Sequence, residues 1–144
     1  MSGFSQPVTT AQIVAAGALI KTNNLSDVNN ATTALVNLGG VPKVVVLNAQ
    51  TNSYTLVLAD LGKLVTITKA TGTTLTVPTN ASVAFAVGSE ILIAARGAGQ
   101  VTVAGAGGVT VNGNPGLKLS GQYSYGCLTQ VATDVWDLVG QLAA

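Results

Sequence analysis

The chain has 144 residues, a net charge of +1 and only 8% charged residues, whereas an ordinary soluble domain has about 25%. This length accommodates one domain with a short appendage. The six basic residues are scattered singly, and no apolar run reaches the roughly 18 to 20 residues of a membrane span. These features exclude a basic nucleic-acid footprint and a membrane-spanning helix.

The low charge itself indicates self-association. A small monomer with so few ionic side chains would expose apolar surface to water, and packing against further copies buries that surface. We therefore expect a homo-oligomer.

The first part of the chain, residues 1–42, predicts an N-terminal anchor and a short helical stem. Residues 9–17 read as a short helix, and a longer one is predicted between Ser26, which can cap exposed amides, and Gly39, which can end a helix. Four apolar residues along it have the spacing of a heptad seam, which predicts a subunit interface: Val28, Ala31, Leu35 and Leu38. The alternative is a single helix that packs on its own β domain.

Residues 43–144 predict a β domain. Short runs rich in Val, Thr and Ile are separated by Gly, Asn and Pro at roughly eight to twelve residue intervals, which is typical of sandwiches and jelly rolls. The Val-Thr-Val run at 101–105 recurs at 109–113 and indicates one duplicated hairpin-like unit. The predicted fold is therefore mainly β, with the helical stem preceding an antiparallel β-sandwich or jelly-roll-like domain. Strands are expected at 44–47, 54–58, 63–68, 73–77, 83–85, 90–94, 101–103, 109–111, 117–119, 123–131 and 135–139.

Catalytic chemistry has little support in the sequence. Histidine is absent, which removes the commonest general base and most transition-metal sites. Asp134 and Asp137 flank Trp136 and are the best candidates for a glycosidase pair, which needs two facing carboxylates. A turn at Asp134 followed by a half-buried strand explains them better. We expect no enzyme, no cofactor and no metal site.

Three aromatic residues are candidates for contact with a glycan. Tyr123 and Tyr125 are expected to project from one strand face together with Cys127, and Trp136 could stack on a sugar ring. Packing at a subunit boundary is the stronger interpretation of the two tyrosines, because charge is scarce.

One segment resembles a motif of known proteins. Asn24-Leu25-Ser26-Asp27-Val28, followed by Ala31, Ala34 and Asn37-Leu38-Gly39-Gly40, is similar to the Leu-Ser-Asp…Asn-Leu-Gly segment common in phage tail-fibre and related virion proteins. The resemblance covers about residues 20 to 42 and implies that identical chains meet there around a threefold axis. Val36 departs from the pattern, since many members carry Thr, and the Arg usual before it is missing.

A second resemblance covers roughly residues 54 to 142 and concerns a β domain frequent in phage fibre and particle-surface proteins. It implies a trimeric β module on a virion and brings no catalytic residues. The landmarks that carry it are the segments at 54–63, 74–78, 87–91, 97–102 and 136–140.

These resemblances favour a non-enzymatic bacteriophage structural protein, made in the host cytoplasm and located on the particle surface. The first hypothesis is a homotrimeric capsid decoration protein, of the head-fibre or cement kind. Its N-terminus would contact the major capsid protein or another virion protein through Phe4, Val8, Ile13 and Val14. A short tail-fibre or receptor-binding module is the alternative within this class. A carbohydrate-binding adhesin module that recognises a host surface glycan is the alternative outside it.

Overall fold

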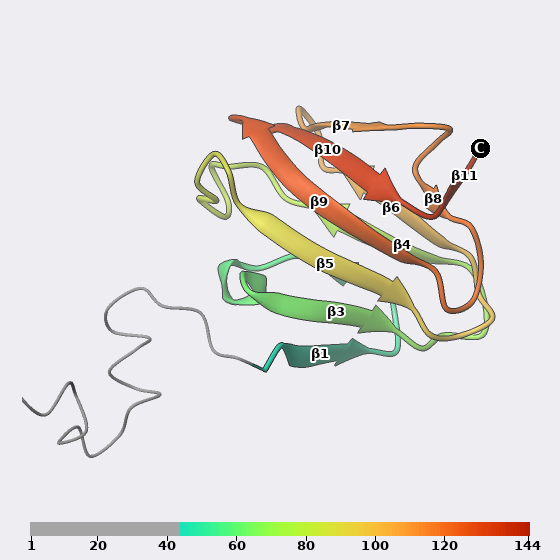
Figure 1. Ribbon diagram of the computed structural model, residues 1–144. Helices are drawn as coiled ribbons and strands as arrows, with labels where there is room; N and C mark the ends of the chain where they lie inside the picture. Colours follow the sequence, from blue (N-terminus) through green and yellow to red (C-terminus); the bar gives the residue numbers. More distant parts are fainter. Residues whose placement is uncertain (1–43) are drawn as a thin grey trace, which may run out of the picture. The chain divides into compact units, whose positions relative to one another are not determined.

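The computed structural model describes residues 44–144, in which the alternating apolar and polar residues form strands, and the longer central ones bury one face. The strands belong to two sheets, one six-stranded and one five-stranded (Figure 1). The strands are β1 (Val46–Gln50), β2 (Tyr54–Thr55), β3 (Lys63–Ile67), β4 (Thr73–Val77), β5 (Glu90–Ala95), β6 (Val101–Gly105), β7 (Thr110–Gly113), β8 (Lys118–Leu119), β9 (Tyr125–Ala132), β10 (Val135–Gly140) and β11 (Leu142–Ala143). Within this range a 3-10 turn, η2 (Leu58–Asp60), lies between β2 and β3.

The first six strands alternate between the two sheets. Strands β1, β3 and β5 are parallel neighbours in the six-stranded sheet, and β2, β4 and β6 are parallel neighbours in the five-stranded sheet. Each odd strand and the even strand after it therefore form one coil, and three such coils stack on each other. This is a β-solenoid-like arrangement with mixed sheets. A mainly β fold is confirmed, but the expected antiparallel sandwich or jelly roll is wrong, because crossovers between the sheets make neighbouring strands parallel.

The last five strands extend both sheets beyond β5 and β6. β9 pairs antiparallel with β5, and β10 pairs antiparallel with β9. In the other sheet β8 pairs antiparallel with β6, and β11 with β8. The strand orders are β1-β3-β5-β9-β10-β7 and β11-β8-β6-β4-β2.

The core lies between the two sheets. The inward-facing residues alternate with outward-facing ones, as Ile91 and Ile93 do with Glu90 and Leu92 on β5. Trp136, 1% exposed, meets the ring of Phe85 edge-on, with centroids 5.3 Å apart. Burial of one such large apolar side chain contributes about 1.5–3 kcal/mol. The other core residues include Leu56, Val65, Ile67, Leu75, Val77, Val101, Val103, Leu119, Leu128 and Leu138.

Two glycines allow the turns of neighbouring coils to touch. The Gly97 amide donates to the carbonyl of Ile67 over 3.0 Å, and the Gly99 amide donates to that of Lys69 over the same distance. A Cβ at Gly99 would run into the backbone of Thr71. The glycine-rich segment therefore serves close backbone stacking between the second and third coils.

Three local expectations are wrong. Residues 83–85 form no strand, although Phe85 still reaches the core. The two Val-Thr-Val runs do not form a hairpin-like unit, because β6 and β7 belong to different sheets. The strand expected at 54–58 is divided into β2 and η2.

Residues 44–144 form one compact unit. The predicted stem interface (Val28, Ala31, Leu35, Leu38) and the predicted anchor (Phe4, Val8, Ile13, Val14) lie outside the described residues.

Candidate interaction surface

The outer face of the six-stranded sheet carries a straight row of apolar side chains. The strand register sets Leu47 beside Leu64, Leu64 beside Leu92, Leu92 beside Cys127, and Cys127 beside Val139. We call these five residues the apolar row. It crosses five adjacent strands, which at about 4.8 Å per strand gives it a length of about 19 Å.

The apolar row is open to solvent. Leu47 is 64% exposed, Leu92 43% and Val139 59%, while Leu64 and Cys127 are half-buried. Exposed large apolar side chains occur singly on any protein, but a contiguous set indicates an interaction site.

The outer face of the five-stranded sheet is different. Its outward residues on β4 and β6 are Thr74, Thr76, Thr102 and Ala104, and Lys118 lies beside Thr102. Hydroxyl groups can bond to water, so this face has no need of a partner. Only one of the two outer faces is therefore suited to apolar association.

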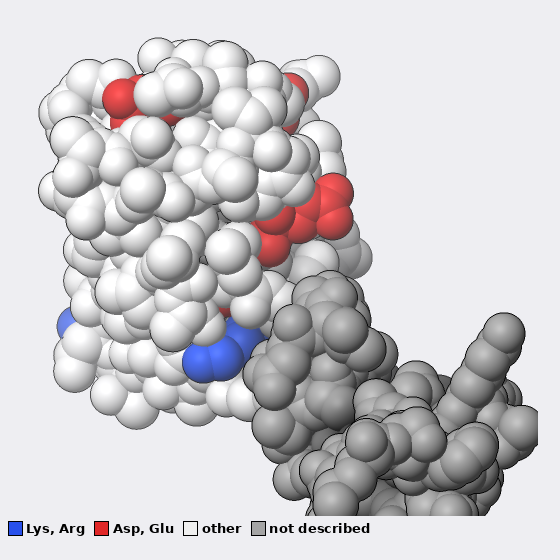
Figure 2. Space-filling view, turned by 90° about the vertical axis from the view of Figure 1, so that its left-hand side faces the viewer, with Lys and Arg blue, Asp and Glu red and all other residues white. Residues whose placement is uncertain are grey.

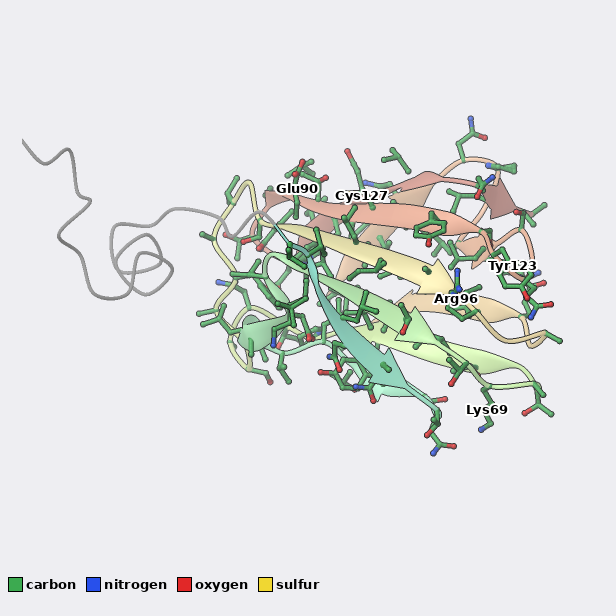
Figure 3. The ribbon with its side chains drawn as sticks, turned by 60° about the horizontal axis from the view of Figure 1, so that its bottom comes forward. Lys69, Glu90, Arg96, Tyr123 and Cys127 are labelled. Atoms are coloured by element: carbon green, nitrogen blue, oxygen red, sulfur yellow. The ribbon has the colours of Figure 1, made fainter. Side chains whose placement is uncertain are left out.

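Charged side chains lie at both margins of the apolar row. Glu90 and Asp137 are level with each other where β5 begins, since both pair with Thr129. Arg96 follows the end of β5, and its guanidinium carbon lies 5.3 Å from the centre of the Tyr123 ring. Figure 3 shows Glu90 at one end of β5, Arg96 and Lys69 at the opposite end of the sheet, and Cys127 on the neighbouring strand. Between these margins the face is uncharged.

A second row beside the apolar row contains smaller side chains and one tyrosine. Ala49, Thr66, Ala94 and Tyr125 follow each other across four strands. A hollow of about 280 Å³ lies here, lined by Leu47, Leu64, Thr66, Thr68, Arg96 and Tyr125.

The side of the molecule at which β3 and β5 begin is shown in Figure 2. Charged groups are few on the described surface seen from that side.

A polar cluster that the sequence did not indicate lies in the first coil. Asp60 is 1% exposed and accepts hydrogen bonds from Asn48 Nδ2 at 2.7 Å, Tyr54 Oη at 3.1 Å and the Val57 amide at 2.9 Å. Burial raises the pKa of the Tyr54 phenol. The hydrogen bond with Asn48 lowers this pKa, and the negative charge of Asp60 raises it further. Because the carboxylate is fully engaged with this chain's own donors, the cluster joins β1, β2 and η2 and serves the fold.

The predicted glycan contacts separate into two groups. Trp136 belongs to the core, and its burial is inconsistent with stacking on a surface sugar. Tyr123 and Tyr125 are exposed. Tyr125 shares the outer strand face with Cys127, as expected, whereas Tyr123 lies in the turn before β9 at a φ of 65°.

The two aspartates weighed as a catalytic pair each have a structural partner. Asp134 Oδ1 accepts the Asn80 amide at 2.6 Å, and Asp137 Oδ1 accepts a bond from Asn112 Nδ2 at 3.0 Å. Asp134 occupies the turn between β9 and β10 at a φ of 58°. Asp134 therefore lies in a turn and Asp137 on an inner strand of the sheet, as the interpretation of a turn followed by a half-buried strand favoured. Across residues 44–144, no three His, Cys, Asp or Glu side chains gather as a metal site would require.

Comparison with known proteins finds no match: no family model fits the chain, and neither a curated protein nor a solved structure is similar to it. In the part of the chain that the structure describes, no helix has the length and hydropathy needed to cross a membrane.

Proposed function

We propose that this chain is a non-enzymatic structural protein of a bacteriophage particle, a homotrimer that decorates the capsid and is anchored through its N-terminus. The observation that carries the proposal is the apolar row on an uncharged outer face, in a chain with only 8% charged residues. Such a face is stable in water when another copy covers it. The resemblance of residues 20 to 42 to virion stem segments supports the phage class.

The number of copies is tested first. Native mass spectrometry and light scattering of the whole chain at micromolar concentration should give three times the 14.3 kDa subunit mass. A monomer under these conditions would remove the physical basis of the proposal.

Location on the particle is tested separately. Antibody-labelled electron microscopy of virions from a phage that carries this gene should place the label on the capsid surface. Label at the tail would instead favour the short tail-fibre or receptor-binding module, and unlabelled virions would contradict the phage assignment.

A carbohydrate-binding adhesin module is the second candidate, and the hollow beside Tyr125 favours it. An exposed tyrosine next to Thr66, Thr68 and Arg96 combines an aromatic surface with hydrogen-bonding groups, which sugar binding requires. Glycan-array binding that is lost in Tyr125→Ala, with the oligomer intact, would support this candidate. Trp136→Ala is unsuitable for this test because it opens the core.

A further inference from the structure

The charges at the two margins of the apolar row point to one particular way of packing three copies. We infer that the outer faces of the six-stranded sheets meet around a threefold axis parallel to the apolar row, and that Glu90 of each chain pairs with Arg96 of the next. The number three rests on the proposed function, whereas the face and the charge pairing come from the described residues.

The direction of the axis follows from the shape of the apolar row. The row runs across the strands, along the direction in which the coils stack. An axis parallel to it brings each apolar side chain level with its own copies, so Leu92 meets Leu92 and Cys127 meets Cys127. An axis along the strands would instead keep each charged margin level with its own copies, so acidic side chains would face acidic ones and basic side chains basic ones, which is unfavourable.

Rotation about this axis also decides which margins meet. Each face has an acidic margin where β5 begins, with Glu90 and Asp137, and a basic margin beyond its end, with Arg96 and Lys69 (Figure 3). In a ring of inward-facing copies, the acidic margin of one face adjoins the basic margin of the next. Opposite charges then face each other at every boundary, which favours this packing over ones that oppose like charges.

Within one chain the two charges are too far apart to interact directly. Glu90 begins β5 and Arg96 follows its last residue, so about 3.3 Å per residue separates their backbones by about 20 Å. Any energetic coupling between the two positions must therefore act between subunits. This makes a charge exchange a direct test.

The test compares Glu90→Arg, Arg96→Glu and the double variant in the whole chain by native mass spectrometry across a dilution series. Each single exchange brings like charges together at three boundaries, and we expect the concentration of half dissociation to rise about tenfold. The double variant restores opposite pairs and should return close to the wild-type value. Additive effects in the double variant would overturn the pairing.

The apolar row is tested by a matched pair of substitutions. Leu92→Lys puts a charge at the inferred axis and should dissociate the trimer, whereas Val57→Lys, at nearly the same exposure (42% against 43%), lies outside this sheet and should leave the trimer intact. Circular dichroism and the melting temperature of both variants exclude unfolding as the cause. A folded, trimeric Leu92→Lys protein would overturn the inferred face.

Cys127, the sole cysteine, provides a third readout. A short bis-maleimide should join two subunits through Cys127 at the axis, giving a covalent dimer in denaturing gels. If the protein is a trimer but shows neither this cross-link nor sensitivity to Leu92→Lys, the inferred face is wrong while the proposed function stands. A monomeric or dimeric wild type would contradict both.

Discussion

The phenol of Tyr54 donates a hydrogen bond to the buried carboxylate of Asp60, with Tyr54 Oη 3.1 Å from Asp60 Oδ2. Asn48 Nδ2 donates to the other carboxylate oxygen at 2.7 Å. These bonds join the first coil at a point where β1 and β2 each lie at a sheet edge. The polar cluster therefore adds to the apolar packing of Leu56 in holding β1, β2 and η2 together.

Replacement of Asp60 by Ala should destabilise the protein. The change leaves the Asn48 amide, the Tyr54 hydroxyl and the Val57 amide without their acceptor, at a cost of about 2–4 kcal/mol. Thermal unfolding followed by circular dichroism measures this. Ser53→Ala, which removes one exposed hydrogen bond from the Thr74 amide, is the control and should cost about 1 kcal/mol or less. An equal loss of stability in both variants would mean that the polar cluster contributes no more than a single exposed hydrogen bond.

Tyr54 should titrate above the usual pKa of a tyrosine. Burial and the negative Asp60 both disfavour tyrosinate, so the folded protein holds this proton more tightly than the unfolded chain. The resulting stability is present below pH 10.0 and is lost as the pH rises through the folded-state pKa. Ultraviolet titration of the Tyr123→Phe/Tyr125→Phe protein reports Tyr54 alone.

The same titration distinguishes the causes of this shift. Adding Asp60→Asn to that protein removes the negative charge, so the pKa of Tyr54 should fall while staying raised by burial. A pKa that rises in this variant would contradict the assignment of causes.

Trp136→Ala should be among the most destabilising single substitutions. The indole is buried and packs edge-on against Phe85, and truncation of such a side chain costs about 3–5 kcal/mol. Denaturant unfolding followed by circular dichroism measures the loss. In the wild-type protein the single tryptophan should emit at short wavelength and shift to the red on unfolding; a red emission from the native protein would place this residue in water.

Gly99→Ala should disturb the stacked turns. The new Cβ would meet the backbone of Thr71, which has no rotamer to give way, so we expect a loss of about 1–3 kcal/mol. Gly107 is the matched control, because a Cβ there meets nothing within 4 Å. Its change to Ala should alter the melting temperature little. Equal melting temperatures for both variants would show that the turns do not stack closely.

Leu35→Asp tests the predicted stem, which the structure does not describe. A carboxylate in a shared apolar seam typically costs several kcal/mol unless it is neutralised, so the trimer should dissociate at higher concentration than the wild type. Thr32→Asp, off the predicted seam, is the control in the same dilution series. An unchanged Leu35→Asp oligomer would show that this residue lies outside any interface.

Much of the secondary structure could be predicted from local patterns. The alternation on β5 and β10 shows which residues share one face, and turn residues mark where strands end, so most strand positions follow from the sequence. Alternation placed Trp136 and Leu138 on one face but did not establish that Trp136 is buried, since Trp136 was also a candidate glycan contact. The pairing of strands does not follow, because alternation says which face is buried and nothing about the neighbouring strand. The three coils also differ in length, which hides the repeat.

The apolar row could be recognised only from the register of the paired strands. Leu47, Leu64 and Leu92 lie far apart in the sequence, and each alone reads as an ordinary exposed residue. Only the parallel pairing of β1, β3 and β5 brings them into one row. Likewise, the partnership of Asn48 with Asp60 depends on the first coil being closed. The sequence did predict the outward position of Tyr125 with Cys127, since both lie on one strand.

Because each coil bonds only to the coils beside it, the coils should unfold locally in a defined order. In such one-dimensional stacks the stability of a unit depends on the units beside it. β1 and β2 each bond one neighbouring strand, whereas β3 and β4 bond two. Amide protons of the first coil should therefore exchange with deuterium before those of the second, and within residues 44–144 unfolding should spread from that end toward the antiparallel strands.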